Sequence, residues 1–288
     1  MRYAFINAHR SQHPVRVLCK MLNVHSSGFY AWLQKPLSDR AIEDKRQTGL
    51  VEQAWKDSNK VYGYRKLYDD LIDMGERVSL NRVARLAHLA GIHAQIGYKK
   101  KPSQFGGKPS VVVGNTLDRQ FDVNAPDRAW VTDITYIRTY EGFAYLCVVI
   151  DLYSRRVVGW ALKSRPATEV ALQALLMAIW KRKPKTGLLI HSDQGTQFTS
   201  REWAAFLREH KIEHSMSRRG NCHDNAVAES FFQLLKREKI RRRTYKTRNQ
   251  ARQDIFEYIE MFYNPKRKHT NNGLLSPIDF ENRQNKMK

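Results

Sequence analysis

Three acidic residues stand where a metal-dependent phosphoryl-transfer site would need them. Asp133 lies in the apolar, β-branched run WVTDITYI, where a carboxylate without a cation or hydrogen-bond donors is costly to bury. Asp193 ends the run LLIHSD, and Glu229 lies in the first turns of a helical segment. Carboxylate oxygens suit Mg²⁺, which also binds phosphate oxygens. Two such ions about 3.5–4 Å apart can hold the attacking and leaving oxygens of a phosphoryl displacement, so these residues are candidates for that chemistry.

The segments around these residues predict a mixed α/β sheet. Three β-rich runs with turns between them predict an antiparallel meander over 129–139, 142–153 and 155–163. A helix capped by Thr168 follows, and then helices alternate with two short strands. This order matches the ribonuclease-H-like fold, a mixed five-stranded sheet with helices on both faces.

This topology would bring the acidic residues together. If the first and fourth strands are neighbours, Asp133 and Asp193 lie side by side at the strand ends, where ligands bind in open α/β sheets. The final helix, from about Asn225 to Lys239, can then carry Glu229 over them.

The overall charge points to a polyanionic partner. The 288 residues include 50 Lys and Arg against 28 Asp and Glu, a formal net charge of +22. The excess is concentrated at the two ends: residues 1–110 hold 19 basic and 9 acidic residues, 111–230 hold 16 and 13, and 231–288 hold 15 and 6. Basic ends around a nearly neutral centre favour nucleic-acid binding.

Composition excludes several classes of protein. With 42% hydrophobic and 11% aromatic residues, the chain is not a disordered polycation. It has no apolar run of transmembrane length and no signal-peptide core at its start. Cys19, Cys147 and Cys222 form no CxxC pair, which predicts reduced thiols in a cytoplasmic protein instead of a disulfide framework or a zinc knuckle.

The basic N-terminal part predicts paired helices. Residues 15–33 indicate two helices joined by a short turn, with Ser26 or Ser27 as the expected N-cap of the second. A second pair, over 64–92, has a helix-capping residue at Ser79.

Two readings of this second pair stay open. A plain helical hairpin would show the same pattern as a helix-turn-helix DNA reader. The basic side chains of Arg82 and Arg85 favour the DNA reader.

The acidic residues are spaced as in a known family. Asp193 and Glu229 are separated by 35 residues, and the chain resembles the DDE transposases related to retroviral integrase. The resemblance lies in WVTDITY around Asp133, VVIDLYSR around Asp151, HSDQGTQF around Asp193, GNCHDNAVAESFFQLLK around Glu229, and the tail YNPKRKHTNNGLLSPIDFE. Within that group the chain is similar to the second-frame product of bacterial insertion sequences of the IS-three type, over nearly its whole length.

The resemblance implies an activity and its site. Asp133, Asp193 and Glu229 would be the catalytic triad and would bind two Mg²⁺ ions, with Mn²⁺ as a substitute. The enzyme would cleave DNA at the element ends and transfer the 3′-hydroxyl to a new phosphodiester, through a circular intermediate. Lys236, seven residues after Glu229 and on the same helical face, would contact a DNA phosphate.

The resemblance also implies an organisation and partners. We expect double-stranded DNA as the substrate and a homo-oligomer on it, in the bacterial cytoplasm at the nucleoid. The expected parts are a helical helix-turn-helix region, a basic flexible linker, a ribonuclease-H-like integrase core and a basic C-terminal helical extension, over 1–98, 99–124, 125–240 and 241–288.

Further side chains are candidates with alternatives. A run of basic residues after the final core helix can neutralise backbone phosphates, namely Arg241, Arg242, Arg243, Lys246 and Arg248. Asp151 competes for a metal role, although it lies at a strand-to-turn junction where Asp is common. His191 and His223 could orient a water or be structural, and Asn225 could cap the helix or touch DNA.

Three rival functions are weighed against a transposase. A structure-specific nuclease would share the acidic cluster but does not require the 35-residue spacing and the matching tail. A DNA-binding protein without activity would lack an acidic residue, and all three are present. A retroviral-type integrase would carry a His/His/Cys/Cys zinc module, and the first 110 residues contain only Cys19.

One feature departs from the family pattern. The active transposase is often a frameshift fusion with an upstream helix-turn-helix and leucine zipper, whereas this chain starts at Met1 and shows no heptad zipper. This motivates the hypothesis that end recognition or multimerisation depends on an upstream-frame product or on fusion to it.

Overall fold

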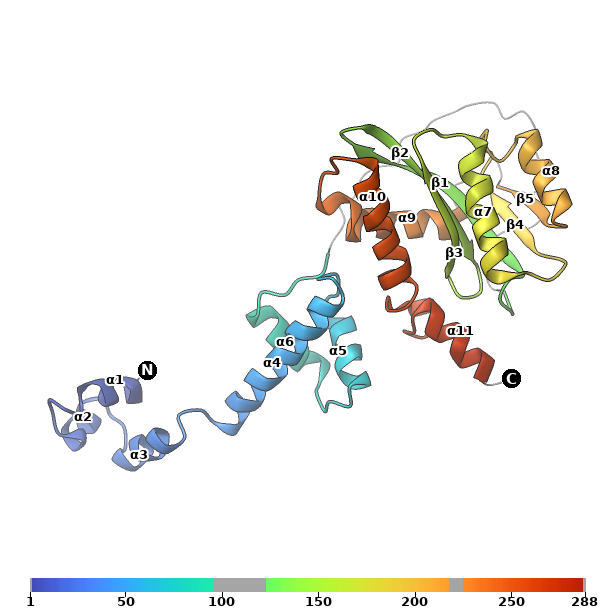
Figure 1. The fold of residues 1–288 in the computed structure, drawn as a ribbon. Helices are drawn as coiled ribbons and strands as arrows, with labels where there is room; N and C mark the ends of the chain where they lie inside the picture. The colour runs from blue at the N-terminus through green and yellow to red at the C-terminus, as the bar shows by residue number, and fades with distance from the viewer. Residues whose placement is uncertain (1, 96–122, 218–224, 287–288) are drawn as a thin grey trace. The chain divides into compact units, whose positions relative to one another are not determined.

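The computed structural model describes residues 2–95, 123–217 and 225–286. The chain divides into two compact units, Met1–Ala94 and Gln95–Lys288, called here the N-terminal unit and the core unit (Figure 1). The linker predicted over 99–124 lies outside the described residues except at its last two positions. In the described part of the chain, no helix has the length and apolarity needed to cross a membrane.

The N-terminal unit begins with a small helical cluster. Its helices are α1 (Arg2–His9), α2 (Val15–Met21) and α3 (Ser26–Gln34). Ile6, Leu18, Cys19 and Phe29 are buried against one another between them. The expected cap by Ser26 or Ser27 is wrong. His25 precedes α3 without a side-chain capping bond, and its ring Nδ1 lies 2.7 Å from Ser27 Oγ.

The second cluster of this unit has three helices, α4 (Asp39–Asp57), α5 (Tyr64–Asp73) and α6 (Leu80–Leu89). Ser79 caps α6 as expected, because its Oγ accepts a hydrogen bond from the Arg82 backbone N–H at 3.3 Å. Leu67 and Leu71 of α5 are buried with Val83 of α6, which gives this cluster a core of its own.

The core unit is built on the predicted five-stranded mixed sheet. Its strands are β1 (Ala129–Thr139), β2 (Gly142–Asp151), β3 (Val157–Lys163), β4 (Leu189–Ser192) and β5 (Glu213–Met216). They lie in the order β3-β2-β1-β4-β5. The first three form an antiparallel meander, β4 runs parallel to β1, and β5 runs parallel to β4.

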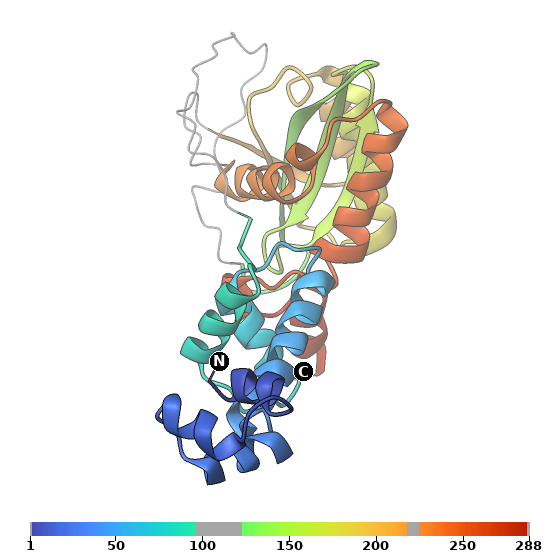
Figure 2. The same cartoon turned by 90° about the vertical axis from the view of Figure 1, so that its left-hand side faces the viewer.

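Helices and short helical turns complete the unit. They are α7 (Thr168–Arg182), α8 (Arg201–Glu209), α9 (Ala226–Glu238), η2 (Ile240–Arg242), α10 (Arg248–Phe256), η3 (Glu257–Tyr263), η4 (Thr270–Asn272) and α11 (Pro277–Lys286). Figures 1 and 2 show α7 and α9 on opposite sides of the sheet, which agrees with the prediction of helices on both faces. Ala167, and not Thr168, occupies the N-cap of α7, because Thr168 already lies within the helix.

The position of α7 depends on a glycine in β3. A Cβ atom at Gly159 would lie 2.2 Å from the Ala174 carbonyl oxygen and 2.8 Å from the Ala178 nitrogen. Both atoms belong to the α7 backbone, which cannot rotate away as a side chain can. The absence of a side chain at Gly159 therefore allows the helix to lie directly on the strand.

The C-terminal segment packs on the same unit. The Asn264 side chain pairs with Val157, accepting from its N–H and donating to its carbonyl oxygen, both at 3.0 Å. Glu281 of α11 accepts hydrogen bonds from Arg156 and Arg182 at 2.7 and 2.8 Å. Residues that follow α9 thus help to hold the edge of the sheet at β3.

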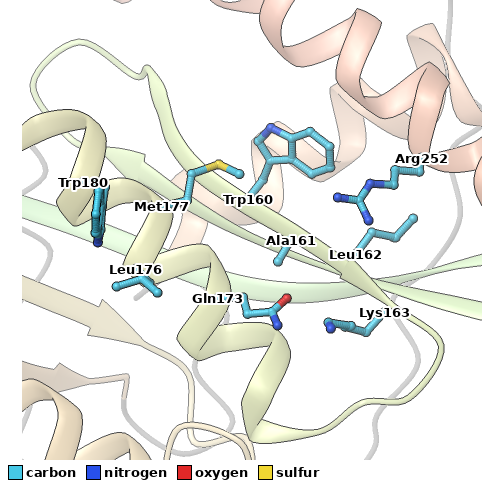
Figure 3. Close-up of a pocket in the computed structure, with 9 residues that line it drawn as sticks. All are labelled: Trp160, Ala161, Leu162, Lys163, Gln173, Leu176, Met177, Trp180 and Arg252. Carbon is cyan, nitrogen blue, oxygen red and sulfur yellow. The ribbon is translucent and has the colours of Figure 1, made fainter.

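A hollow of about 360 Å³ lies beside β3, between α7 and α10 (Figure 3). Trp160 from β3, Trp180 from α7 and Arg252 from α10 line it. In the sheet, β2 lies between β3 and β1, the strand of Asp133, and β4 lies on the far side of β1. This hollow is therefore separate from the acidic residues.

Replacing Gly159 by alanine should loosen this packing. We expect Gly159→Ala to lower the free energy of unfolding by about 1–3 kcal/mol, the usual effect of an overpacked core contact. Urea unfolding of the full chain, followed by tryptophan fluorescence, measures it. Gly49→Ala in α4 is the control, since nothing lies within 4 Å of its added Cβ atom. It should be neutral or stabilising by about 0.5–1 kcal/mol. Equal stability of Gly159→Ala and the wild type would contradict the packing argument.

Candidate active site

The pairing of β1 with β4 brings two of the predicted acidic residues together. The parallel register pairs Ala129 with Leu189, Trp130 with Ile190 and Val131 with His191. Continued by two residues, the same register sets Asp193, which follows β4, level with Asp133 in β1. The predicted adjacency of the first and fourth strands is thus confirmed.

Asp133 is a carboxyl group in an unfavourable setting for negative charge. Burial raises its pKa well above the ordinary value, and the charges of Asp193 and Glu229 raise it further. The Ile134 backbone N–H, which donates to Asp133 Oδ1 at 2.7 Å, and the charge of Lys236 act in the opposite direction. Asp133 therefore experiences the other two carboxylates and would be stabilised by a cation.

Asp193 is oriented by the turn that follows it. The Gly195 backbone N–H donates to Asp193 Oδ1 at 3.0 Å, while burial raises the pKa of this carboxyl. A Cβ atom at Gly195 would lie 2.9 Å from the same oxygen. The glycine lets the backbone approach the carboxylate closely and fix its direction.

Glu229 is brought to the sheet by α9. The apolar side of this helix is buried through Ala228, Phe231, Phe232 and Leu235, and Glu229, at the edge of that side, is half-buried. The sequence pattern predicts this placement, because residues three and four apart share a helical face.

Asn225 joins the start of α9 to β1. It makes no side-chain capping bond, and its Nδ2 donates to the Thr132 carbonyl oxygen at 3.2 Å. The side chain is 4% exposed, and its Oδ1 has no hydrogen-bond partner among the described residues. Asn225 thus occupies the N-cap position of α9 without the side-chain capping bond, and its contact to DNA stays a prediction. This bond attaches α9, one helical turn before Glu229, to Thr132, the residue next to Asp133.

The donor set has the chemistry that a hard divalent cation requires. The carboxylates of Asp133 and Asp193 offer oxygen ligands, and because burial raises the pKa of each, a bound cation would stabilise their charged forms. Glu229 is the third oxygen donor in electrostatic range of Asp133. Among the described residues, no three His, Cys, Asp or Glu side chains already form a metal-binding group.

Lys236 lies between the acidic residues and a basic surface. Its Nζ lies 5.5 Å from the centre of the Tyr136 ring, within the range of a cation–π interaction. Burial lowers the pKa of Lys236, as does the nearby charge of Arg241, whereas Asp133 raises it. The predicted position of Lys236 beside the acidic residues agrees with this geometry.

The other predicted DNA contacts are spread over both units, and several pair with the protein itself. Arg82 and Arg85 each bind one oxygen of Asp44, at 2.8 and 2.7 Å. In the core unit, Arg243 pairs with Asp254 at 2.7 Å.

The remaining members of the basic run also contact backbone or amide groups. Arg242 donates to the Glu238 carbonyl oxygen at 3.4 Å, and the Lys246 backbone N–H donates to Gln250 Oε1 at 3.0 Å. Arg248 donates from Nε to the Phe143 carbonyl oxygen at 3.1 Å. Arg241 is exposed in η2, the turn that follows α9.

Asp151 and His191 have structural surroundings. Asp151 is buried and accepts hydrogen bonds from the Asp127 backbone N–H at 3.0 Å and from Ser154 N–H and Oγ at 3.1 and 2.9 Å. Burial raises its pKa to about 6. His191 is buried between Ser215 and Ser217, at 2.9 and 3.0 Å from their hydroxyl oxygens. His223 lies outside the described residues.

Two tyrosines near Lys236 were not singled out from the sequence. Tyr136 is 61% exposed and Tyr140 is 78% exposed. A signal was present: Tyr136, Arg138 and Tyr140 alternate in the sequence, so on a strand they share one face. Interleaved aromatic and basic residues on one face are typical of nucleic-acid contacts.

Known proteins match most of this chain. Residues 123–222 match the model of the integrase core domain, residues 229–284 a second integrase core domain model, and residues 42–101 an HTH-like domain. The chain is 37% identical over 285 residues to the transposase InsF of insertion sequence IS3A from Escherichia coli K12, covering 98% of this chain and 99% of that protein. It is 34% identical over 270 residues to an uncharacterized 31 kDa protein of insertion element IS600 from Shigella sonnei, covering 94% and 99%.

Solved structures of lower similarity include two viral proteins. The HTLV-2 integrase catalytic core domain in complex with magnesium, in a trimeric form, is 18% identical, covers 55% of this chain and 98% of that one, and has a TM-score of 0.43. A chain of the simian T-cell lymphotropic virus intasome is 20% identical, covers 61% and 55%, and has a TM-score of 0.36.

The environment of Asp133 predicts a pH-dependent stability. Because its pKa is higher in the folded chain than the ordinary value, ionisation of Asp133 opposes folding. This penalty is absent below the ordinary pKa and grows as the pH rises through the folded pKa. Without divalent cations, Asp133→Asn should therefore melt at a higher temperature than the wild type at neutral pH. A difference of about 1 kcal/mol corresponds to about 2–4 °C.

Thermal unfolding from acid to neutral pH measures this difference, which should vanish in acid. Added Mg²⁺ should then raise the melting temperature of the wild type more than that of the variant. Glu202→Gln, an exposed position in α8, is the control and should follow the wild type. Identical melting of Asp133→Asn and wild type at every pH would refute the electrostatic argument.

Removing the Asn225 side chain should weaken the joint between α9 and β1. Asn225→Ala leaves the Thr132 carbonyl oxygen without this donor, so we expect a loss of about 1–3 kcal/mol in the free energy of unfolding. Urea unfolding measures it, with Gln173→Ala, an exposed amide on α7, as the matched control. A loss no larger than that of the control would show that the bond does not hold α9.

Proposed function

Because this chain belongs to the IS3 family of insertion-sequence transposases with an integrase core, we propose that Asp133, Asp193 and Glu229 are its catalytic residues. The observation that carries the proposal is the parallel register of β1 and β4, which would set Asp133 level with Asp193 when continued by two residues. The charge of Glu229, which raises the pKa of Asp133, supports including the third carboxylate in the proposal. The proposed reaction is cleavage of DNA at the element ends followed by transfer of the 3′-hydroxyl to a new phosphodiester.

We propose that the three carboxylates hold Mg²⁺, with Mn²⁺ as a substitute and two ions per site. Their oxygen donors and the burial that raises the pKa of Asp133 and Asp193 support this choice. Bound there, the ions would polarise the phosphate and activate the attacking oxygen. The chain's own residues orient the ligands: the Gly195 N–H directs Asp193, and Asn225 holds the start of the helix that carries Glu229.

The proposed DNA contacts differ in how available their charges are. Lys236, beside Asp133, is proposed to contact the phosphate nearest the reaction, and the exposed Arg241 the next part of the strand. Arg82 and Arg85 of the N-terminal unit are proposed to contact DNA as well. Their bonds to Asp44 would then be exchanged for, or shared with, phosphate oxygens.

Arg242, Arg243, Lys246 and Arg248 complete the proposed phosphate contacts. They lie in the segment that directly follows α9, the helix of Glu229. Such contacts are independent of base sequence and weaken as salt concentration rises.

The proposed organisation assigns one task to each part. Residues 1–98 would recognise DNA, 99–124 would link, 125–240 would perform the chemistry and 241–288 would strengthen DNA binding. We propose that several copies act together on double-stranded DNA, since an element has two ends to be cut. A product of the upstream frame, or fusion to it, is proposed to assist recognition of those ends.

A strand-transfer assay tests the catalytic assignment. With labelled element-end DNA and Mg²⁺ or Mn²⁺, Glu229→Gln should lose activity by about 10³-fold, the order seen when one charge-stabilising group of an active site is removed. DNA affinity should stay near that of the wild type, because the substitution removes a negative charge and leaves the basic residues in place. Gel analysis of cleaved and joined products measures both steps.

Glu202→Gln is the matched control, an exposed Glu→Gln change in α8 of the same unit. Full activity of Glu229→Gln would overturn the triad. Cleavage by the wild type without any joined product would favour a structure-specific nuclease on the same fold.

A further inference from the structure

A groove of about 570 Å³ lies where the end of β1 meets the end of α9 and the turn η2. Its size lies in the usual range for sites that bind small ligands. Aromatic and basic side chains line it, namely Tyr136, Arg138, Tyr140, Lys236, Arg241 and Arg243. Among the described residues that line the groove, none is acidic.

The groove exists because β1 extends beyond its partner on one side. In the described part of the chain, β4 pairs with β1 over Ala129–Val131, and the next backbone contact on that side is the bridge between Thr139 and Tyr245. The stretch between these two contacts borders the groove through Tyr136 and Arg138. The chain that follows α9 returns to β1 at Tyr245 and forms the opposite wall.

Tyr136 and Tyr140 expose most of their side chains to solvent, whereas a tyrosine that only stabilises the fold is usually more deeply buried. Tyr140 is 78% exposed and Tyr136 is 61% exposed. One side of Tyr136 meets Phe143 edge-on, with ring centres 5.3 Å apart, and Lys236 Nζ lies 5.5 Å from its centre. Tyr136 is thus held in a defined orientation while most of its surface remains open.

One side chain links the groove to the proposed active site. Lys236 lines the groove, and its charge acts on Asp133. A DNA strand whose scissile phosphate lies at the carboxylates would therefore have its neighbouring nucleotides within reach of the groove. Positive charge for the backbone and aromatic rings for the bases are the two features of single-strand binding surfaces.

We propose that this groove binds unpaired nucleotides of the DNA strand at the active site, with their bases stacked on Tyr136 and Tyr140. The phosphates between these bases would contact Arg138 and Arg241. The inference rests on the proposed DNA-cleaving function and adds a ligand class to it, namely nucleotides that have left the duplex. The protein would then hold a melted DNA end in preference to a blunt one.

Binding of two DNA probes to the full chain tests this proposal. One is a short blunt duplex, and the other is the same duplex with a few unpaired nucleotides that include 2-aminopurine. Without divalent cations, fluorescence anisotropy should show about fivefold to 100-fold tighter binding of the extended probe, the range expected for stacking of one base. The 2-aminopurine fluorescence should be quenched as the base stacks. Equal affinity for both probes, with no quenching, overturns the proposal without any variant.

Substitutions then locate the site. Tyr136→Ala and Tyr140→Ala should each lower the affinity for the extended probe more than the affinity for the blunt duplex, and so reduce the preference between them. Tyr136→Phe and Tyr140→Phe should keep the preference, because the ring does the stacking. Loss in the Phe variants would instead indicate hydroxyl contacts to phosphate, and equal loss for both probes a general duplex contact. Either result overturns the proposal.

Trp180→Ala is the control, since this ring on α7 lines the separate hollow drawn in Figure 3 and not the groove, and is 75% exposed. It should bind both probes as the wild type does. If the wild type joins DNA ends and the Ala variants keep the full preference, the groove is refuted while the proposed function stands. If the wild type neither binds nor joins DNA, the proposed function itself fails.

Discussion

Placing carboxylates together in a partly buried position is the constraint on which the core unit depends. Asp133 lies in β1 and Asp193 directly follows β4, the parallel neighbour of β1, and burial raises the pKa of both. Without a bound cation, the ionised form of a buried carboxyl group opposes folding. The surrounding structure must therefore hold these side chains in position. The sheet does so through β1–β4 pairing, and the hydrophobic side of α9 does so for Glu229. The unfavourable charge is thus held in place by packing energy from elsewhere in the unit.

The short length of β4 has consequences on the same side of the sheet. Because β4 pairs with β1 over three residues, the chain beyond Val131 is left for other contacts. Asn225 uses the Thr132 carbonyl oxygen, and Tyr245 takes the bridge at Thr139. The residue that precedes α9 and the segment that follows α9 and η2 are therefore both attached to this one strand. A single edge of β1 sets the position of the helix that carries Glu229 and Lys236.

The sequence predicts the sheet well because its signals are local. Alternation and turns define the meander, a short apolar run defines β4, and β5 is the second of the two short strands predicted after the meander. The helix caps at Ser26 or Ser27 and at Thr168 were predicted wrongly, because serine and threonine can lie inside the first turn as easily as before it. Capping depends on where the preceding chain enters the helix, which local composition does not determine.

Long-range pairing of charges is what the sequence could not provide. A count of Lys and Arg treats every cation as available to DNA, yet Arg182 is held by Asp127 and Glu281, and Arg267 by Glu238. These carboxylates lie many residues away along the chain, so no spacing rule connects them. The net charge of +22 therefore combines structural cations with those free to bind a phosphate. Lys236 is proposed as one of the latter, because its Nζ lies over the Tyr136 ring and an ammonium group has three donors.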